Sequence, residues 1–129
     1  MEIGQEFKAE FQISEAIHKG FTNVFNDRNP MHIDDSYAQS KGYKGKIMQG
    51  NILNGFLSYF IGETLPVKNV IIISQEISFR QAFFIGDALT LVARIKDVHE
   101  LYEVYDFKYN FSNQQGNKIA TGKISIKSI

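Results

Sequence analysis

Apolar and polar side chains alternate with a period of two over much of this chain, which is typical of strands with one buried face. Residues 6–13 show this pattern first, and the second half of the chain returns to it after Pro66. Segments rich in β-branched or aromatic side chains there predict further strands at residues 70–79, 89–95, 104–111 and 118–127. Turn formers at 85–87 and 114–117 separate consecutive strands, so the sheet is expected to be antiparallel.

A helical period replaces this alternation directly after the first strand. Ser14 offers a capping oxygen, and apolar residues then recur at helical spacing up to Val24. This helix should end near Asn26, because Asn29 precedes a proline and is pushed out of the helical region.

Residues 27–46 are polar and rich in turn formers, so they predict a loop around one short helix. Asp34 can cap that helix over residues 35–41, and Gly42 can end it in the left-handed conformation. The most apolar helical stretch follows at residues 47–61. A helix that is apolar around most of its circumference is expected to be buried on several sides.

Together these elements predict a single α+β domain over residues 1–129, in which a long antiparallel β-sheet wraps around a central hydrophobic α-helix. Such a sheet leaves two edges and one broad face in need of cover. We therefore expect a homodimer or a higher homo-oligomer.

The composition narrows the classes of function. Basic and acidic residues balance at 14 each, and no cluster of Lys and Arg with stacking aromatics is present, which argues against nucleic-acid binding. The N-terminus lacks the pattern of a signal peptide and no apolar run reaches membrane-spanning length, so we expect a cytoplasmic protein without a membrane partner. The absence of cysteine excludes disulfides, thiol nucleophiles and thiolate metal sites.

The three histidines lie far apart in the sequence. None has a helix-spaced partner, so a histidine-based metal site has little support, and neither a metal nor another cofactor is expected. His18 on the first helix and His99 in the charged turn 97–100 are interpreted as solvated residues. The aromatic residues within 104–111 share one face and are expected to pack in the core or at a dimer contact.

One short segment combines groups capable of acid–base chemistry. Residues 27–32 place a carboxylate, Asp27, and an imidazole, His32, on a loop stiffened by Pro30. Together these groups can hold a water molecule and move protons in opposite directions near neutral pH. The pair alone is ambiguous, because an Asp and a His in a polar loop more often cap a turn and face solvent than catalyse a reaction.

A glycine at the head of the apolar helix supplies a second candidate group. Gly50 leaves its backbone N–H uncovered at the positive end of the helix dipole, where a developing oxyanion such as an enolate can be stabilised. The alternative is purely steric: Gly50 and Gly55 can be present only to let the sheet approach the helix closely.

The motif D-x-N-P-x-H at residues 27–32, followed by I-M-Q-G at residues 47–50, resembles the MaoC-like (R)-specific enoyl-CoA hydratases. These are the hydratase-2 motif proteins of the hot-dog superfamily. The similarity continues through Leu65-Pro66, the strand ending at Phe79 and the turn 85–87, and it covers most of the chain from about residue 21 to residue 95.

The resemblance implies a hydro-lyase of fatty acid metabolism, an enzyme that reversibly adds water to trans-2-enoyl thioesters to give (R)-3-hydroxyacyl products. It implies that Asp27 and His32 activate the water and that the Gly50 N–H receives the thioester oxygen. Asn29 and Ser58 fall on positions that support this site. Coenzyme A is the expected carrier of the acyl group, rather than acyl carrier protein.

The chain departs from the family at the head of the central helix. Family members usually have His-Gly-Met where this chain has Gln49-Gly50-Asn51, so Gln49 is expected to alter a hydrogen bond beside the oxyanion site or the shape of the pocket. Two alternatives stay open. A hot-dog acyl-CoA thioesterase is disfavoured by the intact motif, and a non-catalytic acyl-CoA-binding hot-dog subunit is supported only by the changes at Gln49 and Asn51.

Overall fold

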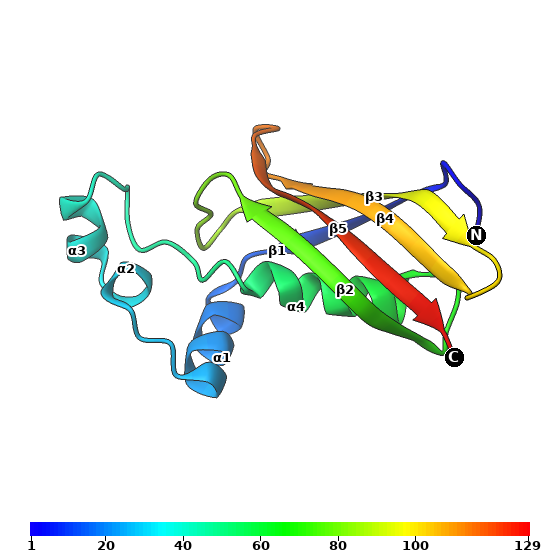
Figure 1. The fold of residues 1–129 in the computed structure, drawn as a ribbon. Helices are drawn as coiled ribbons and strands as arrows, with labels where there is room; N and C mark the ends of the chain where they lie inside the picture. Colours follow the sequence, from blue (N-terminus) through cyan, green and yellow to red (C-terminus); the bar gives the residue numbers. More distant parts are fainter.

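Five strands form one antiparallel sheet in the structure, a computed structural model that describes residues 1–129 (Figure 1). Their spatial order is β1-β3-β4-β5-β2, which leaves β1 and β2 at the two edges. The predicted strands are confirmed, with bounds β1 (Glu6–Gln12), β2 (Val70–Phe79), β3 (Ala88–His99), β4 (Val104–Ser112) and β5 (Lys118–Ser128). The predicted turns are confirmed as well, since Gly86 and Gly116 both have positive φ angles.

Between β1 and β2 the chain forms the helices α1 (Glu15–Phe25), α2 (Pro30–Ile33), α3 (Asp35–Ser40) and α4 (Ile52–Tyr59). A π-helix, η1 (Phe60–Thr64), continues α4. The first helix begins and ends as predicted: the Ser14 hydroxyl accepts from the Ile17 N–H, and Asn26 is left-handed. Helix α2 was not predicted. Asn29 caps it and Pro30 is its first residue, a favourable start for a helix too short to show a period.

The prediction of one helix over 47–61 is wrong at its start, because α4 begins only at Ile52. The backbone N–H groups of Ile47 and Met48 donate instead to the carbonyl oxygens of Met31 in α2 and of Phe83 in the loop after β2. Met48 is 3% exposed, so this apolar segment is covered by the fold although it is not helical. Gly50 therefore lies in the turn before the helix, and its Asn51 neighbour makes no side-chain cap.

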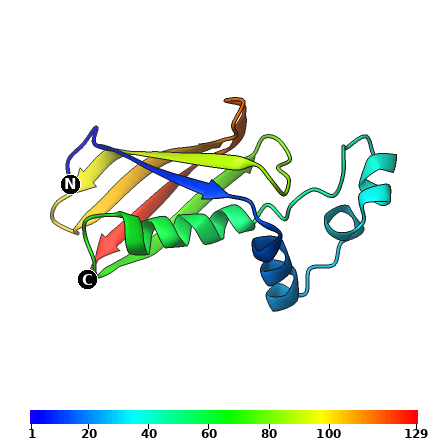
Figure 2. The same cartoon turned by 180° about the vertical axis from the view of Figure 1, so that it is seen from behind.

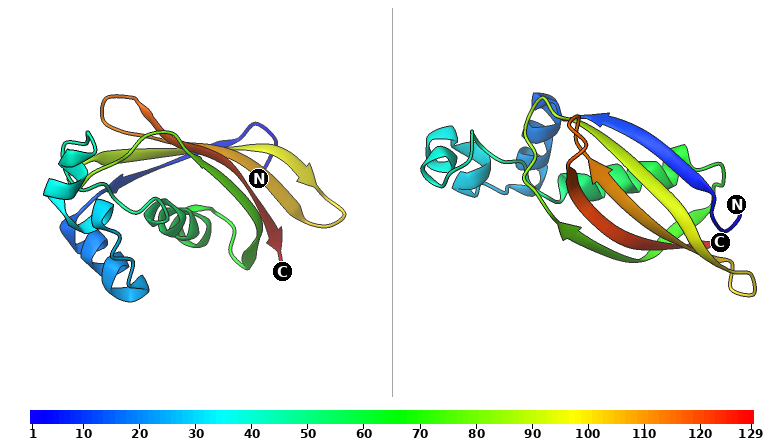
Figure 3. Two further views of the ribbon diagram at one scale, coloured as in Figure 1. Left: turned by 60° about the vertical axis from the view of Figure 1, so that its left-hand side comes forward. Right: turned by 90° about the horizontal axis from the view of Figure 1, so that it is seen from above.

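Helix α4 lies against the concave face of the curved sheet (Figure 2, Figure 3). Its apolar residues Leu53 and Leu57 are fully buried and pack with aromatic side chains of β4, of which Phe107, Tyr109 and Phe111 are buried. The prediction that the aromatic face of β4 packs in the core is confirmed. The burial of these apolar side chains is the main source of stability for a sheet wrapped around one helix.

The two ends of the sheet differ in what they carry (Figure 1). Helices α1, α2 and α3 project from one end, whereas both chain termini and the β3–β4 turn lie at the other. The reading of His99 as a turn residue is wrong, since it is the last residue of β3 and pairs with Val104 of β4. None of the helices combines the length and apolar character needed to cross a bilayer.

Candidate active site

The loop between α1 and α2 is shaped by Asn29. Its side-chain oxygen accepts from the Met31 N–H at 3.1 Å, and its own N–H lies 3.4 Å from Oδ1 of Asp27. Asn29 thus orders the backbone between the two candidate acid–base residues, as an Asx turn does. This contact agrees with the supporting position that the resemblance gave Asn29.

The His32 ring is oriented by a hydrogen bond to the backbone of Ile47. Nδ1 of its ring lies 2.8 Å from the carbonyl oxygen of Ile47. A carbonyl oxygen only accepts, so Nδ1 carries the ring proton and Nε2 of the neutral ring holds a free lone pair. The ring is partly buried and lies in a position suited to a general base.

Gly50 combines the two features that the sequence offered as alternatives. A Cβ atom at this position would come within 2.7 Å of the Phe79 ring, so the close approach of strand β2 favours glycine. In addition, no protein acceptor binds the Gly50 N–H, although the Gly50 carbonyl oxygen accepts from the Leu53 N–H. A free backbone N–H in the turn that opens a helix is a suitable donor to an oxyanion.

Asp27, His32 and Gly50 line one cavity of about 420 Å³, which we call the polar pocket. The rest of its wall comes from Tyr43, Ile47, Met48, Gln49, Asn51, the last residue of β2, Phe79, and residues 80–83 after it. No ion pair joins Asp27 to His32. The carboxylate and the imidazole therefore face a shared space without neutralising each other, an arrangement that leaves room for a water molecule and a substrate.

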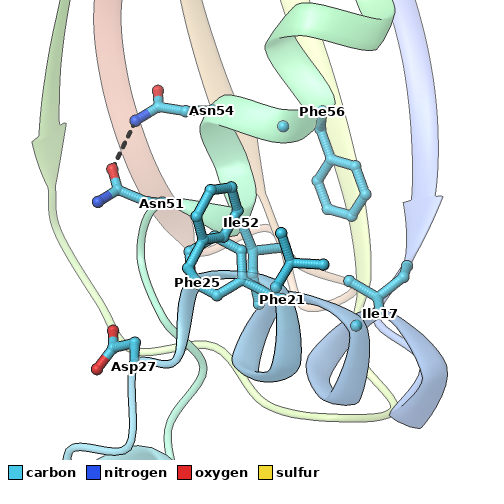
Figure 4. Close-up of a pocket in the computed structure, with 11 residues that line it drawn as sticks. Ile17, Phe21, Phe25, Asp27, Asn51, Ile52, Asn54 and Phe56 are labelled. Carbon is cyan, nitrogen blue, oxygen red and sulfur yellow. Dashed lines mark hydrogen bonds between the residues drawn. The ribbon is translucent and has the colours of Figure 1, made fainter.

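A larger cavity of about 800 Å³ lies between α1 and α4, and we call it the apolar pocket (Figure 4). Its apolar lining consists of Ile17, Phe21, Val24, Phe25, Ile52 and Phe56. Asp27 and Asn51 line both pockets, so the two cavities are adjacent at these residues.

Two asparagines on the wall of the apolar pocket bond to each other. Nδ2 of Asn54 donates to Oδ1 of Asn51 at 2.7 Å (Figure 4), and Oδ1 of Asn54 accepts from the Gln75 side chain. Much of their hydrogen-bonding capacity is used within the protein. The polarity that Asn51 and Asn54 add to the sequence of this helix is thus partly satisfied at the pocket wall.

The interpretation of His18 as a solvated residue is wrong. Its exposed fraction is 4%, and Nδ1 lies 3.1 Å from Oε1 of Gln49. Burial is the main cause that lowers the pKa of His18, so the neutral ring is favoured. His18 and Thr22 are one helical turn apart and face the same partner, Gln49, a contact that the sequence alone did not reveal because the partner lies 31 residues further along the chain.

Ser58 is exposed on α4 and lines neither pocket, so its role stays a prediction. Gln49 lies at the wall of the polar pocket, where its side chain is buried and bonded to α1. The predicted site residues thus fall into three groups: Asp27, His32 and Gly50 face the pocket, Asn29 and Gln49 support it, and Ser58 lies apart.

Comparison with known proteins places this geometry in a family. The family model described as a MaoC-like domain matches residues 1–112. The chain belongs to the MaoC-like family. This MaoC-like chain is 26% identical over 127 residues to the (R)-specific enoyl-CoA hydratase of Aeromonas caviae, covering 98% of this chain and 95% of that protein. It is 32% identical over 92 residues to the (R)-specific enoyl-CoA hydratase of Rhodospirillum rubrum, covering 71% of this chain and 64% of that protein.

The solved structure of the (R)-hydratase from A. caviae superposes on this MaoC-like chain with a TM-score of 0.92. The match covers 100% of this chain and 98% of the other, at 26% identity. The predicted fold class, a hot-dog sheet around a central helix, is therefore confirmed. The likeness in fold and the family model together identify the class of enzyme to which the two pockets should be compared.

Proposed function

We propose that this MaoC-like chain is a hydro-lyase that reversibly hydrates trans-2-enoyl thioesters to (R)-3-hydroxyacyl thioesters. The observation that carries the proposal is that Asp27, His32 and Gly50 line one pocket, which shares Asp27 and Asn51 with a neighbouring apolar cavity. The relatives named (R)-specific enoyl-CoA hydratase support it.

The β5 strand, which extends past the family match and pairs with both β2 and β4, supports treating residues 1–129 as one domain.

The proposed reaction uses a water molecule held between the Asp27 carboxylate and His32. As the water oxygen adds to Cβ of the enoyl thioester, one of its protons passes to this pair, and a proton is delivered to Cα. The thioester oxygen gains negative charge on the way, and the Gly50 N–H stabilises it. Dehydration is the same sequence in reverse.

In the proposed complex, each of the two pockets binds a different part of the substrate. The apolar pocket between α1 and α4 suits the acyl chain, and its volume of about 800 Å³ leaves space beyond a short acyl group. The carrier would then extend through the polar pocket. The wall of this pocket includes Arg80, whose cationic side chain is suited to binding a phosphate group. Coenzyme A is the proposed carrier, in keeping with the names of the relatives, and this substrate supports a cytoplasmic enzyme of fatty acid metabolism.

A homodimer is the proposed assembly. Strand β2 is an edge of the sheet, and its residues Ile71, Ile72 and Ile73 are 45%, 38% and 48% exposed. An exposed apolar edge strand is suited to pairing with a second copy. Val24 and Phe25 beside the apolar pocket are also largely exposed, so a second subunit can cover this opening.

The decisive experiment follows the enoyl-thioester absorbance with crotonyl-CoA and with longer enoyl-CoA substrates. We expect turnover by the wild type and a loss of about 10²- to 10⁴-fold in kcat for Asp27→Asn, because the carboxylate can no longer take part in proton transfer. Asp97→Asn, at the far end of the sheet, is the matched control and should keep the wild-type rate.

Equal rates for wild type and Asp27→Asn at every chain length would overturn the proposal. Release of free thiol, with an enoic acid in place of a 3-hydroxyacyl thioester as the product, would identify a thioesterase instead. Binding of enoyl-CoA without any turnover would identify a non-catalytic subunit.

A further inference from the structure

Three polar side chains are buried together beneath the polar pocket. His18 and Thr22 come from α1 and Gln49 from the segment before α4, and their exposed fractions are 4%, 5% and 2%. Asp87 is the only other polar or charged residue of the chain that is buried. Burying polar groups costs free energy unless they are hydrogen-bonded, so three such groups at one place require a physical reason.

The amide of Gln49 uses all of its hydrogen-bonding groups. Its nitrogen donates to Oγ1 of Thr22 at 2.8 Å and to the carbonyl oxygen of Asp27 at 3.4 Å. Its oxygen accepts from Nδ1 of His18 at 3.1 Å. The amide oxygen can only accept, so His18 must carry its proton on Nδ1. The Asp27 carbonyl oxygen can only accept, so it turns the amide nitrogen of Gln49 toward Asp27 and Thr22, and His18 is then the donor to the amide oxygen.

The segment 47–50 contacts every part of the proposed site. The Ile47 carbonyl oxygen accepts from Nδ1 of His32, the Gln49 side chain holds the Asp27 carbonyl oxygen, and Gly50 carries the free N–H. The bond from Gln49 is the only hydrogen bond between Asp27 and this segment. The Gln49 amide is therefore the direct link between Asp27 and the segment that carries Gly50, beside the two hydrogen bonds that join Ile47 to Met31 and His32.

We propose that His18, Thr22 and Gln49 are positioning residues that hold Asp27 at the place the hydration reaction needs. The inference rests on the proposed function. His18 does not exchange a proton with the substrate. It acts through Gln49, to whose amide oxygen it donates a hydrogen bond. A misplacement of about 1 Å in a reacting group can reduce a rate by about 10²-fold, so a buried hydrogen bond that sets such a position affects catalysis directly.

Two substitutions of His18 separate positioning from packing. The amide nitrogen of an asparagine occupies nearly the place of imidazole Nδ1, so His18→Asn keeps the donor to Gln49 but leaves a small void. His18→Leu fills the space and removes the donor. We expect His18→Leu to lose about 10- to 100-fold in kcat with little change in KM, and His18→Asn to recover most of this loss because it keeps the donor to Gln49.

His99→Leu is the matched control, because it makes the same change at an exposed histidine, and it should keep the wild-type kcat. The inference is wrong if His18→Leu keeps the wild-type kcat, or if His18→Asn loses as much kcat as His18→Leu. Thr22→Val, which removes one acceptor of Gln49 and preserves volume, replaces any His18 variant that does not fold, with the same expected split between kcat and KM.

A crystal structure of the Gln49→Leu protein tests the inference without any turnover. We expect Asp27 to be displaced relative to Gly50 while α4 and the sheet keep their positions. An unchanged Asp27 would overturn the positioning role. A wild type that turns over no enoyl thioester contradicts the proposed function alone, and the crystal comparison still decides the role of Gln49.

Discussion

The two ends of the sheet each bring a histidine and an aspartate together, with opposite results. At the β3–β4 end, Nε2 of His99 lies 2.8 Å from Oδ2 of Asp106, and the two groups satisfy each other in an exposed ion pair. At the other end, Asp27 and His32 line one pocket without an ion pair, and the imidazole proton is used by the Ile47 carbonyl oxygen. A directly paired His and Asp form a surface contact, whereas a separated pair leaves space for reactants.

Secondary contacts reinforce this difference. Asp106 also accepts from the Ser125 hydroxyl, and this hydrogen bond, followed by that of His99, lowers the pKa of the Asp106 carboxyl. The partnership with Asp106 raises the pKa of His99. The side chains of Asp97, His99 and Asp106 also offer three ligand atoms within 4.8 Å, but each is exposed or partly so. The groups at the active-site end are supported instead by buried hydrogen bonds from α1.

The largest expected effect is on the activity of the active-site end. His32→Asn keeps a donor near the place of Nδ1, and hence the bond to Ile47, but removes the free Nε2. We expect kcat to fall by about 10²- to 10⁴-fold with little change in stability. His99→Asn is the matched variant at the other end. Initial rates with crotonyl-CoA test the pair, and similar rates for both variants would remove the functional distinction between the two ends.

Stability should show the next largest contrast. Leu57 of α4 is fully buried, whereas Leu101 in the β3–β4 turn is 85% exposed. Leu57→Ala leaves a cavity beneath the sheet and should cost about 2–5 kcal/mol of unfolding free energy. Leu101→Ala should change it by no more than about 0.5 kcal/mol. Denaturant unfolding measures both, and a large loss for Leu101→Ala would show that the turn packs in an assembly.

Substrate range should respond to changes along α4. A Cβ atom at Gly55 would meet open space, and this residue lines the apolar pocket. Gly55→Leu should therefore lower kcat/KM for long enoyl-CoA substrates by about 10-fold more than for crotonyl-CoA. Gly62 also has open space but lines neither pocket, so Gly62→Leu is the control. Equal losses at all chain lengths would place the acyl group elsewhere.

The smallest effects concern pH, and the two ends should respond with opposite signs. The pKa of His99 is raised above its ordinary value of 6.5, so its pair stabilises the fold below that pH and is lost as pH rises through the folded-state pKa. The pKa of His18 is lowered from 6.5, so the unfolded chain binds its proton first and stability falls as pH drops below 6.5.

Melting temperatures between about pH 5 and pH 9 test this contrast. His99→Ala should be less stable than wild type on the acid side and equal to it on the alkaline side. His18→Leu should flatten the loss of stability on the acid side. The opposite pH dependence for the two variants would contradict both the pairing of His99 with Asp106 and the burial of His18.

The sheet could be predicted from the sequence because most strands carry their own alternation, whereas β2, which does not alternate, is marked by its run of β-branched side chains. The start of α4 could not, because the backbone N–H groups of Ile47 and Met48 bond to residues distant in the sequence, Met31 in α2 and Phe83 in the loop after β2, and not within a helix. The same limit hid the environment of His18. A single histidine on a helix resembles a solvated residue until its partner, Gln49, is brought to it by the fold.

The dependence of the proposed site on residues 47–50 also separates chemistry from substrate choice along the chain. His32 and Asp27 are hydrogen-bonded to these four residues, and Gly50 is one of them. Apart from Asp27, the apolar pocket is lined only by α1 and by residues from Asn51 onward. An enzyme engineer could therefore vary the wall at Gly55 or Phe56 to accept other acyl groups and leave the proton-transfer apparatus intact. Insertions or deletions within 47–50 would have no such freedom, since they would shift all three groups at once.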